Sequence, residues 1–394
     1  MEIVARETEW EFNNLAQRIA MVFPGEPGFE MGKKYLKGLL GSAERKNGWQ
    51  LAESMGEATP YAIQQFLYRS RFSADALRDV GRAYVSDHLG TEDGVLIPDE
   101  TGFLKQGKMS CGVKRQYSGT AGRVENCQIG VFVSYASEKG HAPIDRRLYL
   151  PEEWAKDERR RKKAGIPAEL TFQTKPQMAL EMIQEATEAG VPYQWVSGDC
   201  VYGDNRAIRQ WLEEARKCYV LCVSGKEHLQ YGGENVPVSL ILKGLDENEW
   251  FEASCGDGSK GPRLYNWRML EIDLPVMEGW KRFLLVRRSR KDPDELRAYL
   301  CFAPVETPRE KFVQIAGIRW TVETCFKESK SEVGMDHYEV QSYDGWYKHV
   351  TFACLALAFL TVLSIYSLDG KSLQQHNPSD KSLDAFKKGR NLHV

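Results

Sequence analysis

Three acidic residues at separate places in the chain could together hold metal ions. Asp99 ends the short apolar segment Val95–Asp99, Asp199 ends a second one, Val191–Asp199, and Glu323 lies in a segment with helical spacing. A carboxylate at the end of an apolar strand is costly to bury unless a cation meets it. Two divalent cations can use three carboxylates at once. The three acids therefore predict a two-metal site.

The segment around Glu323 also carries basic residues on the same face. Each residue of an α-helix advances by about 100°, so Glu323 and Lys330 fall within about 40° of Arg319. Glu328 projects from nearly the opposite side, and this favours Glu323 as the third acid. The alternative is an ordinary i,i+4 ion pair between Arg319 and Glu323 that only stabilises the helix. An adjoining apolar stripe should bury against a sheet: Ile315, Ile318, Val322, Cys325 and Val333.

The elements around the first two acids predict a mixed α/β sheet. Three strands with short connections, expected at Val95–Asp99, Lys108–Tyr117 and Cys127–Tyr135, favour an antiparallel meander. A charged stretch, residues 145–175, is expected to be irregular. Helices at 177–189 and 205–216 then alternate with strands at 191–199 and 218–224, an order that adds parallel strands. Asp199 falls at the carboxyl end of a crossover strand, where open α/β sheets bind ligands.

The remaining segments predict the domain organisation. Helical spacing throughout residues 1–90 indicates a small all-α domain, with Thr59-Pro60 and Ser73 as expected helix starts. Residues 91–225 form the first part of the catalytic core, and 226–308 a β-rich insertion with strands at 265–274, 281–288 and 296–304. Residues 309–370 return to the core with helices at 309–332 and 345–366. A polar tail, 371–394, is expected to be poorly ordered.

Composition restricts the function classes. The 394 residues are 42% hydrophobic and carry a net charge of −2, which excludes a protein that coats nucleic acid by bulk charge. Four basic clusters predict either one basic channel or separate solvated faces: Lys114-Arg115, Arg146-Arg147, Arg159 to Lys163 and Lys281 to Lys291.

The cysteines and the apolar segments bear on the compartment. Nine scattered cysteines without a C-x-x-C pair indicate neither a disulfide framework nor a zinc ribbon, and a reducing cytoplasm fits best. Residues 1–18 lack the apolar core of a signal peptide. The apolar segment Val350–Tyr366 is expected to be a buried core helix, with a membrane span as the alternative.

Four sequence segments resemble a known family. They are IPDETG at 97–102, KQGKMSCGVKRQYSGTAGR at 105–123, WVSGDCVYGDN at 195–205 and RWTVETCFKESK at 319–330. With these motifs the sequence resembles the DDE-class cut-and-paste transposases of bacterial insertion sequences, in the branch with a Tyr-Arg-Glu-Lys signature. The resemblance implies an RNase H-like core in which Asp99, Asp199 and Glu323 bind two Mg²⁺ ions, for which Mn²⁺ can substitute.

The resemblance also implies a reaction and its partners. Such an enzyme binds double-stranded DNA at the terminal inverted repeats, hydrolyses the ends to free 3′-OH groups and joins them to target DNA, with a hairpin intermediate as an option. A homodimer in the DNA complex, and no membrane, is expected. Arg319 and Lys330 would hold phosphates beside the cleaved bond. Lys114 and Arg115, on a basic hairpin, are further candidates for phosphate contacts, although a solvated hairpin explains them equally well.

Several positions leave alternatives open. The tyrosine of the signature corresponds to Ala316, and Trp320 or Tyr338 are possible substitutes for it. Glu100 is an alternative to Asp99, since adjacent strand residues point to opposite faces. Three tryptophans of the insertion are expected in the core, with stacking on a flipped base as the other option: Trp250, Trp267 and Trp280.

Two other functions compete with transposition. An RNase H-like nuclease or resolvase would cut without joining, and a regulator would bind DNA without chemistry. The additional helical and β-rich segments favour a transposase over a simple nuclease. The retained acids, Arg319 and Lys330 argue against a silent regulator.

Overall fold

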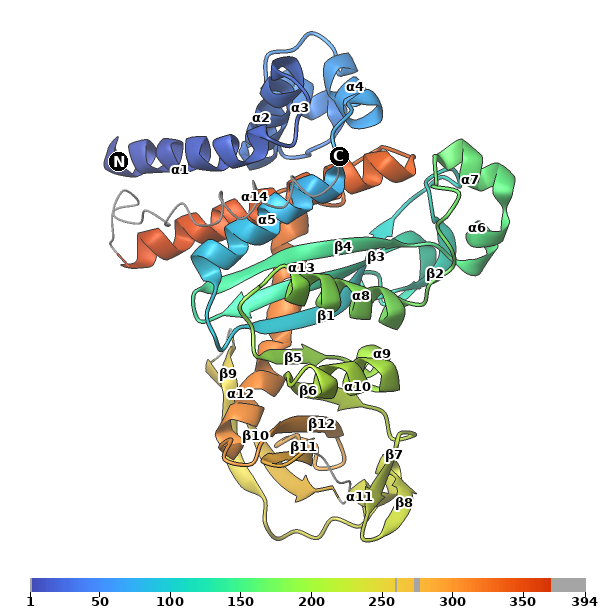
Figure 1. The fold of residues 1–394 in the computed structure, drawn as a ribbon, viewed down its shortest axis with the longest axis vertical. Helices are drawn as coiled ribbons and strands as arrows, with labels where there is room; N and C mark the ends of the chain where they lie inside the picture. The colour runs from blue at the N-terminus through green and yellow to red at the C-terminus, as the bar shows by residue number, and fades with distance from the viewer. Residues whose placement is uncertain (1, 259–260, 273–276, 370–394) are drawn as a thin grey trace.

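A ten-stranded mixed sheet organises the molecule (Figure 1). The computed structural model describes residues 2–258, 261–272 and 277–369. The strand order is β2-β3-β1-β5-β6-β12-β11-β10-β9, with β4 paired to β3 as well; β7 and β8 form a separate hairpin. The strands are β1 (Val95–Leu104), β2 (Lys114–Ser118), β3 (Arg123–Ser137), β4 (Gly140–Tyr149), β5 (Trp195–Gly198), β6 (Cys218–Val223), β7 (His228–Tyr231), β8 (Glu234–Pro237), β9 (Phe251–Gly258), β10 (Gly261–Glu271), β11 (Trp280–Arg288) and β12 (Leu296–Pro304).

The first six strands form the predicted mixed core. β3 runs antiparallel to β1, β2 and β4, and short turns join it to β2 and to β4. The predicted meander was wrong in its order, because β3, and not β2, is the strand next to β1. β5 and β6 are parallel to β1 and to each other, because helices separate them along the chain: α8 (Lys175–Glu188), α9 (Cys200–Gly203) and α10 (Arg206–Glu214). The order β4-β3-β1-β5-β6 confirms the RNase H-like α/β fold.

Two further predictions about this core were wrong in detail. β1 continues to Leu104 instead of ending at Asp99, so Asp99 lies in the middle of a strand. The stretch 145–175 is only partly irregular: β4 extends through Tyr149, and two short helices follow, α6 (Glu152–Lys156) and α7 (Glu158–Ala164), before an irregular segment at 165–174. β4 escaped detection because its buried positions include Asp145 and Arg146, which hide the period-two pattern of a strand.

The β-rich segment predicted for residues 226–308 is present, and it extends the same sheet. β12 pairs antiparallel with β6, from Ala298 opposite Val223 to Phe302 opposite Tyr219. β11, β10 and β9 follow outward, each antiparallel to the last. A helix, α11 (Val238–Lys243), lies near the β7–β8 hairpin. The division of the chain into domains stays a prediction; the sheet itself continues across the boundary predicted at 225/226, where β12 pairs with β6.

Five helices precede the sheet, as expected for residues 1–90. They are α1 (Glu2–Ala20), α2 (Glu26–Leu40), α3 (Gly48–Ser54), α4 (Tyr61–Arg69) and α5 (Ala74–Leu89). The Ser73 hydroxyl caps α5 by accepting from the Ala76 N–H, as predicted. The start of α4 was misplaced by one residue, since Pro60 is its N-cap and Thr59 makes no cap.

The last described helix, α14 (Tyr343–Asp369), packs against these N-terminal helices. It contacts α2, α4, α5 and β4, and Figure 1 shows it beside α5. Phe352 lies within 6 Å of the rings of Tyr35, Phe66 and Phe72. Residues 343–365 are long and apolar enough to cross a membrane, with a mean hydropathy of 1.8, but 72% of that window is buried inside the protein. The structure therefore agrees with the predicted core helix. The tail predicted at 371–394 lies outside the described residues.

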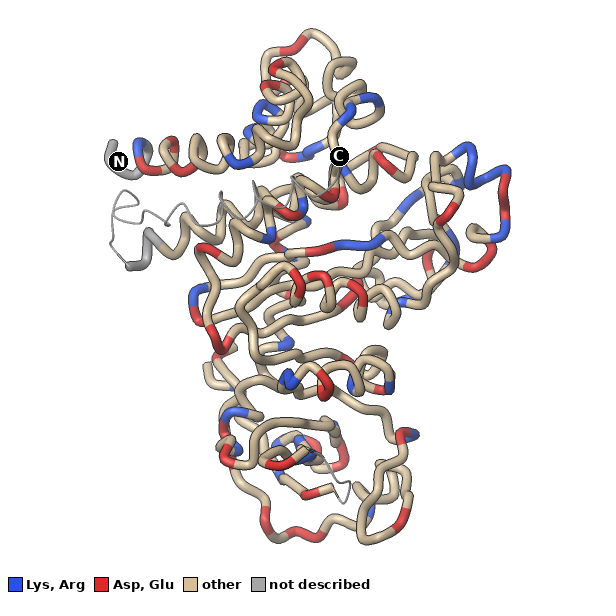
Figure 2. Tube along the Cα trace, viewed as in Figure 1, with Lys and Arg blue, Asp and Glu red and all other residues tan. Residues whose placement is uncertain are grey.

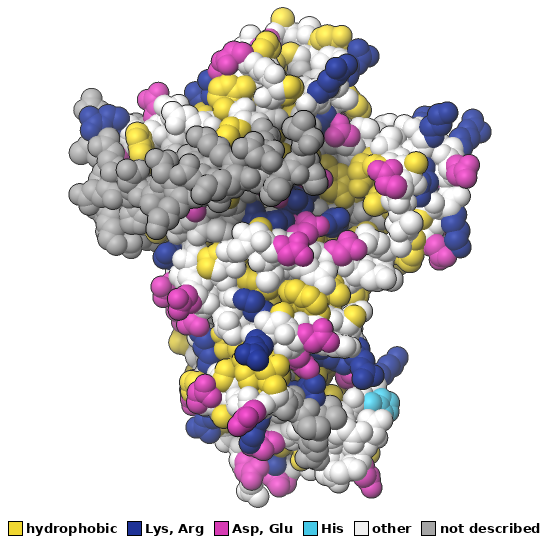
Figure 3. All heavy atoms as spheres, viewed as in Figure 1, with side chains coloured by type: hydrophobic (Ala, Val, Ile, Leu, Met, Phe, Trp, Pro, Cys, Tyr) yellow, Lys and Arg dark blue, Asp and Glu magenta, His cyan; other side chains and the backbone are white. Residues whose placement is uncertain are grey.

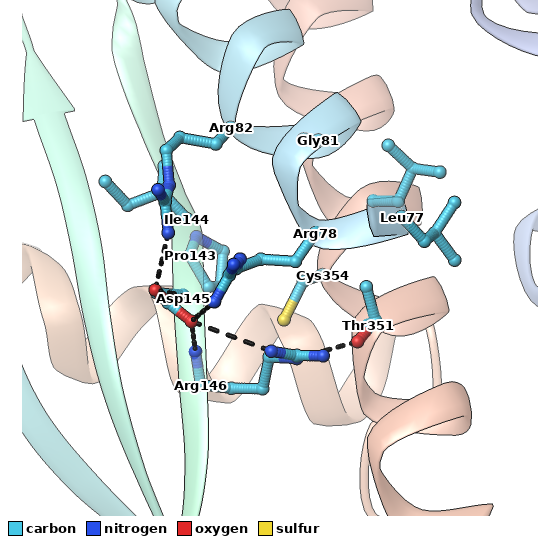
Figure 4. A pocket seen from close by; sticks show the side chains of 12 residues that line it. Leu77, Arg78, Gly81, Arg82, Pro143, Ile144, Asp145, Arg146, Thr351 and Cys354 are labelled. Atoms are coloured by element: carbon cyan, nitrogen blue, oxygen red, sulfur yellow. Dashed lines mark hydrogen bonds and ion pairs between the residues drawn. The ribbon is translucent and has the colours of Figure 1, made fainter. Parts of the chain in front are cut away.

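A buried ion-pair network joins α5 to β4 and α14 (Figure 4). The Asp145 carboxylate, 1% exposed, accepts from Arg82 at 2.6 Å and from Arg78 at 3.3 Å. Arg146 donates through Nε to the Thr351 hydroxyl at 2.7 Å. Arg146 is itself only 1% exposed, so it cannot form part of a basic DNA channel.

Candidate active site

Asp99 and Asp199 lie on neighbouring parallel strands at the same level. β1 and β5 pair in register at Leu96 and Val196, and each aspartate comes three residues later. Asp199 follows the end of β5 and caps α9, where its Oδ1 accepts from the Val201 N–H at 2.9 Å. Asp99 Oδ1 accepts from the Glu100 N–H at 2.7 Å. The register of the sheet thus brings together two acids that are 100 residues apart.

Glu323 reaches this place on a broken helix. The single helix expected at 309–332 is two, α12 (Arg309–Ile318) and α13 (Trp320–Ser331), which meet at Arg319. Arg263 Nη2 donates to the Gly317 carbonyl at 3.2 Å, and a continuous helix would use that carbonyl for its own i,i+4 bond. α12 packs on β9 and α13 contacts β1 and β3, so the two helices lead from the added strands to β1 (Figure 1), the strand that carries Asp99.

Arg319 links the third acid to the first. Its guanidinium lies 3.0 Å from Glu323 Oε1 and 3.9 Å from Asp99 Oδ2. The i,i+4 ion pair between Arg319 and Glu323, which the sequence offered as an alternative interpretation, is therefore present. It lies beside Asp99, a candidate catalytic residue, and does not face solvent alone. Glu328 instead pairs with His141 Nε2 at 2.9 Å.

Glu100 has partners of its own. Its Oε1 accepts from Lys175 Nζ at 2.7 Å and its Oε2 from the Tyr202 hydroxyl at 2.7 Å. Both oxygens are thus committed to α8 and α9, while Asp99 faces Arg319. This arrangement favours Asp99 over Glu100 as the first acid, and it gives Glu100 the role of tying β1 to the helix that Asp199 caps.

The site carries more negative charge than its surroundings can balance. Burial, followed by the charge of Asp199, raises the pKa of Asp99 to about 7. Burial, followed by the charge of Glu100, raises the pKa of Asp199. Arg319 opposes both shifts without cancelling them. A cation placed between the two aspartates would relieve this repulsion.

The donors fit a hard divalent cation. Carboxylate oxygens are the ligands that Mg²⁺ and Mn²⁺ prefer. Because the pKa values of Asp99 and Asp199 are both raised, a cation bound here would stabilise their charged forms. Within residues 2–258, 261–272 and 277–369, however, no three His, Cys, Asp or Glu side chains converge into a finished metal-ligand cluster. Glu323, held by Arg319, is the acid whose partner must change to complete a three-carboxylate set.

Lys330 lies beside the acids but is fully occupied. Its ammonium donates to Thr101 Oγ1 at 2.8 Å, the Gly102 carbonyl at 2.9 Å and Thr120 Oγ1 at 2.9 Å. Burial lowers its pKa. Lys330 therefore joins α13 to β1 and to the β2–β3 turn, and it must exchange one of these bonds to hold a phosphate. Thr120 had no signal in the sequence, since its role depends on a contact 210 residues away.

An open cleft of about 790 Å³ borders these groups. Its lining joins two of the three acids, Asp99 and Glu323, to the β2–β3 turn and to the segment after α13. The lining residues are Asp99, Glu100, Thr101, Gly119, Thr120, Glu323, Phe326, Lys327, Lys330, Ser331, Asp336 and His337. The cleft is wide and open to solvent, as a site for an extended phosphate chain requires.

The other residues predicted to contact DNA differ in how exposed they are and in whether a carboxylate pairs with them. Lys114 pairs with Glu153 at 2.9 Å, whereas Arg115 is exposed on β2. Trp320, beside Arg319, is 55% exposed, but Tyr338 is buried and donates to Gln128 Oε1. Only Trp320 of these two is therefore placed to replace the signature tyrosine. Trp267 is fully buried, as expected of a core residue.

The chain matches two family models. One, described as DDE superfamily endonuclease, matches residues 28–239, and the other, described as Transposase DDE domain, matches residues 174–359. A probable transposase for insertion sequence element IS701 from Microchaete diplosiphon is 25% identical over 327 residues, which are 82% of this chain and 80% of the relative.

Among solved structures, the NurA nuclease from Sulfolobus solfataricus matches 68% of this chain and 86% of its own. The identity is 9% and the TM-score 0.27, too low to support an argument. The endonuclease model alone covers more than half of the chain. The chain therefore belongs to the DDE superfamily endonucleases and, within them, to the DDE transposases of insertion sequences.

Proposed function

We propose that Asp99, Asp199 and Glu323 together bind two Mg²⁺ ions and that the protein cuts and joins the ends of its insertion sequence. The observation that carries this proposal is the pairing of Asp99 and Asp199 at one level of the sheet, with Glu323 joined to Asp99 through Arg319. When bound, the ions would activate the attacking oxygen and stabilise the leaving oxygen of a phosphodiester.

Arg319 is the residue that must change partners. As long as it neutralises Asp99 and Glu323, it stands in for cationic charge at the site. Once these carboxylates have other partners, its planar guanidinium is free to hold a DNA phosphate in a bidentate contact. Lys330 can join it by giving up a hydroxyl of Thr101 or Thr120.

The proposed reaction has two steps at the same site. Water attacks the phosphodiester at the terminal inverted repeat and frees a 3′-OH, and the hydroxyl then attacks target DNA or, in a hairpin route, the opposite strand. A homodimer would pair the two ends. The nine cysteines are free thiols, which agrees with action in a reducing cytoplasm on nucleoid DNA.

Labelled DNA carrying the ends of the element tests the proposal. Wild-type protein with Mg²⁺ or Mn²⁺ should release 3′-OH ends and form joined products on a gel. Asp99→Ala, Asp199→Ala and Glu323→Ala should abolish both products. Glu328→Ala is the matched control, since Glu328 lies on the same helix but pairs with His141, and it should stay active.

The cleavage and joining products distinguish a transposase from a nuclease and test each acid separately. Cleaved ends without joined products would favour a nuclease or resolvase. Full cleavage by any one acid variant would refute that residue's assignment. Mg²⁺ titration followed by calorimetry should show lost binding in the acid variants and normal binding in Glu328→Ala.

A further inference from the structure

The four basic clusters of the sequence differ in how well carboxylates neutralise them. Arg146 is buried, and Lys114 pairs with Glu153. The cluster at residues 281–291 is widely paired, with partners Glu271, Glu213, Glu295, Glu247 and Glu252. In the described chain, none of the basic residues of α7 forms an ion pair with a carboxylate. This helix therefore presents the least compensated positive charge of the four.

Part of that charge lines a built pocket of about 220 Å³, which we name the basic pocket. It is formed by side chains from four separate segments, none of them acidic: Tyr68, Lys108, Trp154, Arg160, Lys163 and Gln341. Figure 2 shows Lys and Arg gathered along α7 and near the end of α4, and Figure 3 shows them on the surface of the α6–α7 lobe.

The pocket wall is held in place by ordered contacts. Trp154, 2% exposed, donates through Nε1 to the Val113 carbonyl at 2.8 Å. The Arg160 guanidinium carbon lies 3.7 Å from the centroid of the Trp154 ring, and among the described residues no carboxylate pairs with this guanidinium. Arg161 donates to the carbonyls of Ala155 and Pro167 and thereby closes the lobe. Arg160 is therefore positioned to contact an anion, whereas Arg161 is structural.

Two chain segments connect the basic pocket to the active-site cleft. His337 lines the cleft and Gln341 lines the pocket, so their Cα atoms are at most about 14 Å apart. The strand and loop after Thr101 make the same connection, ending at Lys108. About four base pairs of duplex, at 3.4 Å per base pair, span that distance.

We infer that the basic pocket binds a backbone phosphate of the DNA end, a few nucleotides from the phosphodiester that is cut. Arg160 supplies a bidentate contact and Lys163 and Lys108 supply point charges. Exposed Arg69 and Arg71, next to Tyr68, continue the positive surface onto the N-terminal helices. The inference rests on the proposed function, because it requires DNA as the substrate.

A charge-matched pair of double variants tests this site. Arg160→Ala/Lys163→Ala removes two positive charges from the pocket. Arg159→Ala/Lys162→Ala removes two from the same helix, but neither residue lines the pocket, and Lys162 lies about 200° around the helix from Arg160. Lobe integrity is checked in both by thermal unfolding and tryptophan fluorescence.

Binding to a labelled duplex of the element's end is measured by anisotropy from 50 to 400 mM NaCl, without divalent cation. Each phosphate contact contributes about 0.9 to the slope of log K against log salt. The pocket variant, which loses one phosphate contact, should lose about 0.9 units of slope and bind more weakly at every salt concentration. The control should change the slope by less than about half a unit. Equal losses in both variants, or none in the pocket variant, would overturn the inference.

Cleavage at saturating DNA separates this inference from the proposed function. The control variant, with the pocket and all three acids intact, should cleave saturating DNA at the wild-type rate, and the pocket variant should need more DNA to reach half of its own maximal rate. A wild-type protein that binds DNA but never cleaves it would refute the proposed chemistry alone. A wild-type protein that cleaves, together with a pocket variant that binds normally, would refute the pocket alone.

Discussion

Replacing the Asp99 carboxylate should stabilise the metal-free protein while it destroys activity. The pKa of Asp99 is raised from 3.8 to about 7, chiefly by burial. The folded state therefore holds this proton more tightly than the unfolded state does. The stability associated with the protonated carboxyl is complete below about pH 4, is lost as the pH rises to about 7, and stays lost above it.

The size of the effect follows from the shift. Three pKa units at about 1.4 kcal/mol each give a penalty of about 4 kcal/mol above pH 7. Two of those units are lost between pH 5 and pH 7. The free energy of unfolding of Asp99→Asn, relative to wild type, should therefore increase by about 3 kcal/mol between pH 5 and pH 8.

Urea unfolding in EDTA, at pH 5 and at pH 8, measures this difference. Asp257→Asn, at an exposed position near the end of β9, is the control and should change stability equally little at both values. Mg²⁺ should narrow the gap at pH 8 by stabilising wild type more than Asp99→Asn. A gain of the same size at both pH values, or none at all, would refute the claim that Asp99 is buried against uncompensated charge.

Two further substitutions test how the site is supported. Asp145→Asn leaves Arg78 and Arg82 without their buried carboxylate and should lower the free energy of unfolding, measured in urea at pH 7, by about 3 to 5 kcal/mol. The control Asp87→Asn removes a surface ion pair and should lower it by less than about 1 kcal/mol. Equal losses in the two variants would contradict the buried network. Gly317→Ala places a Cβ 1.8 Å from the Cys255 carbonyl oxygen and should lower the cleavage rate by displacing α13 from Asp99. The control Gly81→Ala, whose Cβ meets nothing closer than 3.5 Å, should leave the cleavage rate unchanged. Unchanged cleavage by Gly317→Ala would show that the position of Glu323 does not depend on the close packing of Gly317 against Cys255.

The sequence was sufficient where local pattern and contact agree. Residues 127–135 alternate apolar side chains at period two, and they form the centre of β3. The order of strands and helices predicted the parallel pairing of β5 with β1, and this pairing brings Asp199 to Asp99. The helical face shared by Arg319 and Glu323 was likewise visible, because it depends only on spacing within one segment.

Long-range contacts were not predictable in this way. β4 was missed because Asp145 and Arg146 are buried charged residues. Their hydrogen-bond partners lie on α5 and α14, and no local sequence pattern reveals these contacts. The break at Arg319 depends on Arg263, some 50 residues earlier in the chain. Lys330 was expected to face DNA, and its hydrogen bonds to Thr101 and Thr120 became apparent only when three distant segments were seen together.

The packing of α14 on the N-terminal helices has a consequence for how the chain matures on the ribosome. The aromatic faces of α2 and α4, with Tyr35 and Phe66, find their cover in Phe352. Synthesis runs from the N-terminus, so almost 300 residues must be added before that cover exists. A chain that stops short of α14 keeps those aromatic faces exposed even when all three acids have been made. The packing of the N-terminal helices is therefore completed only after α14 has been synthesised.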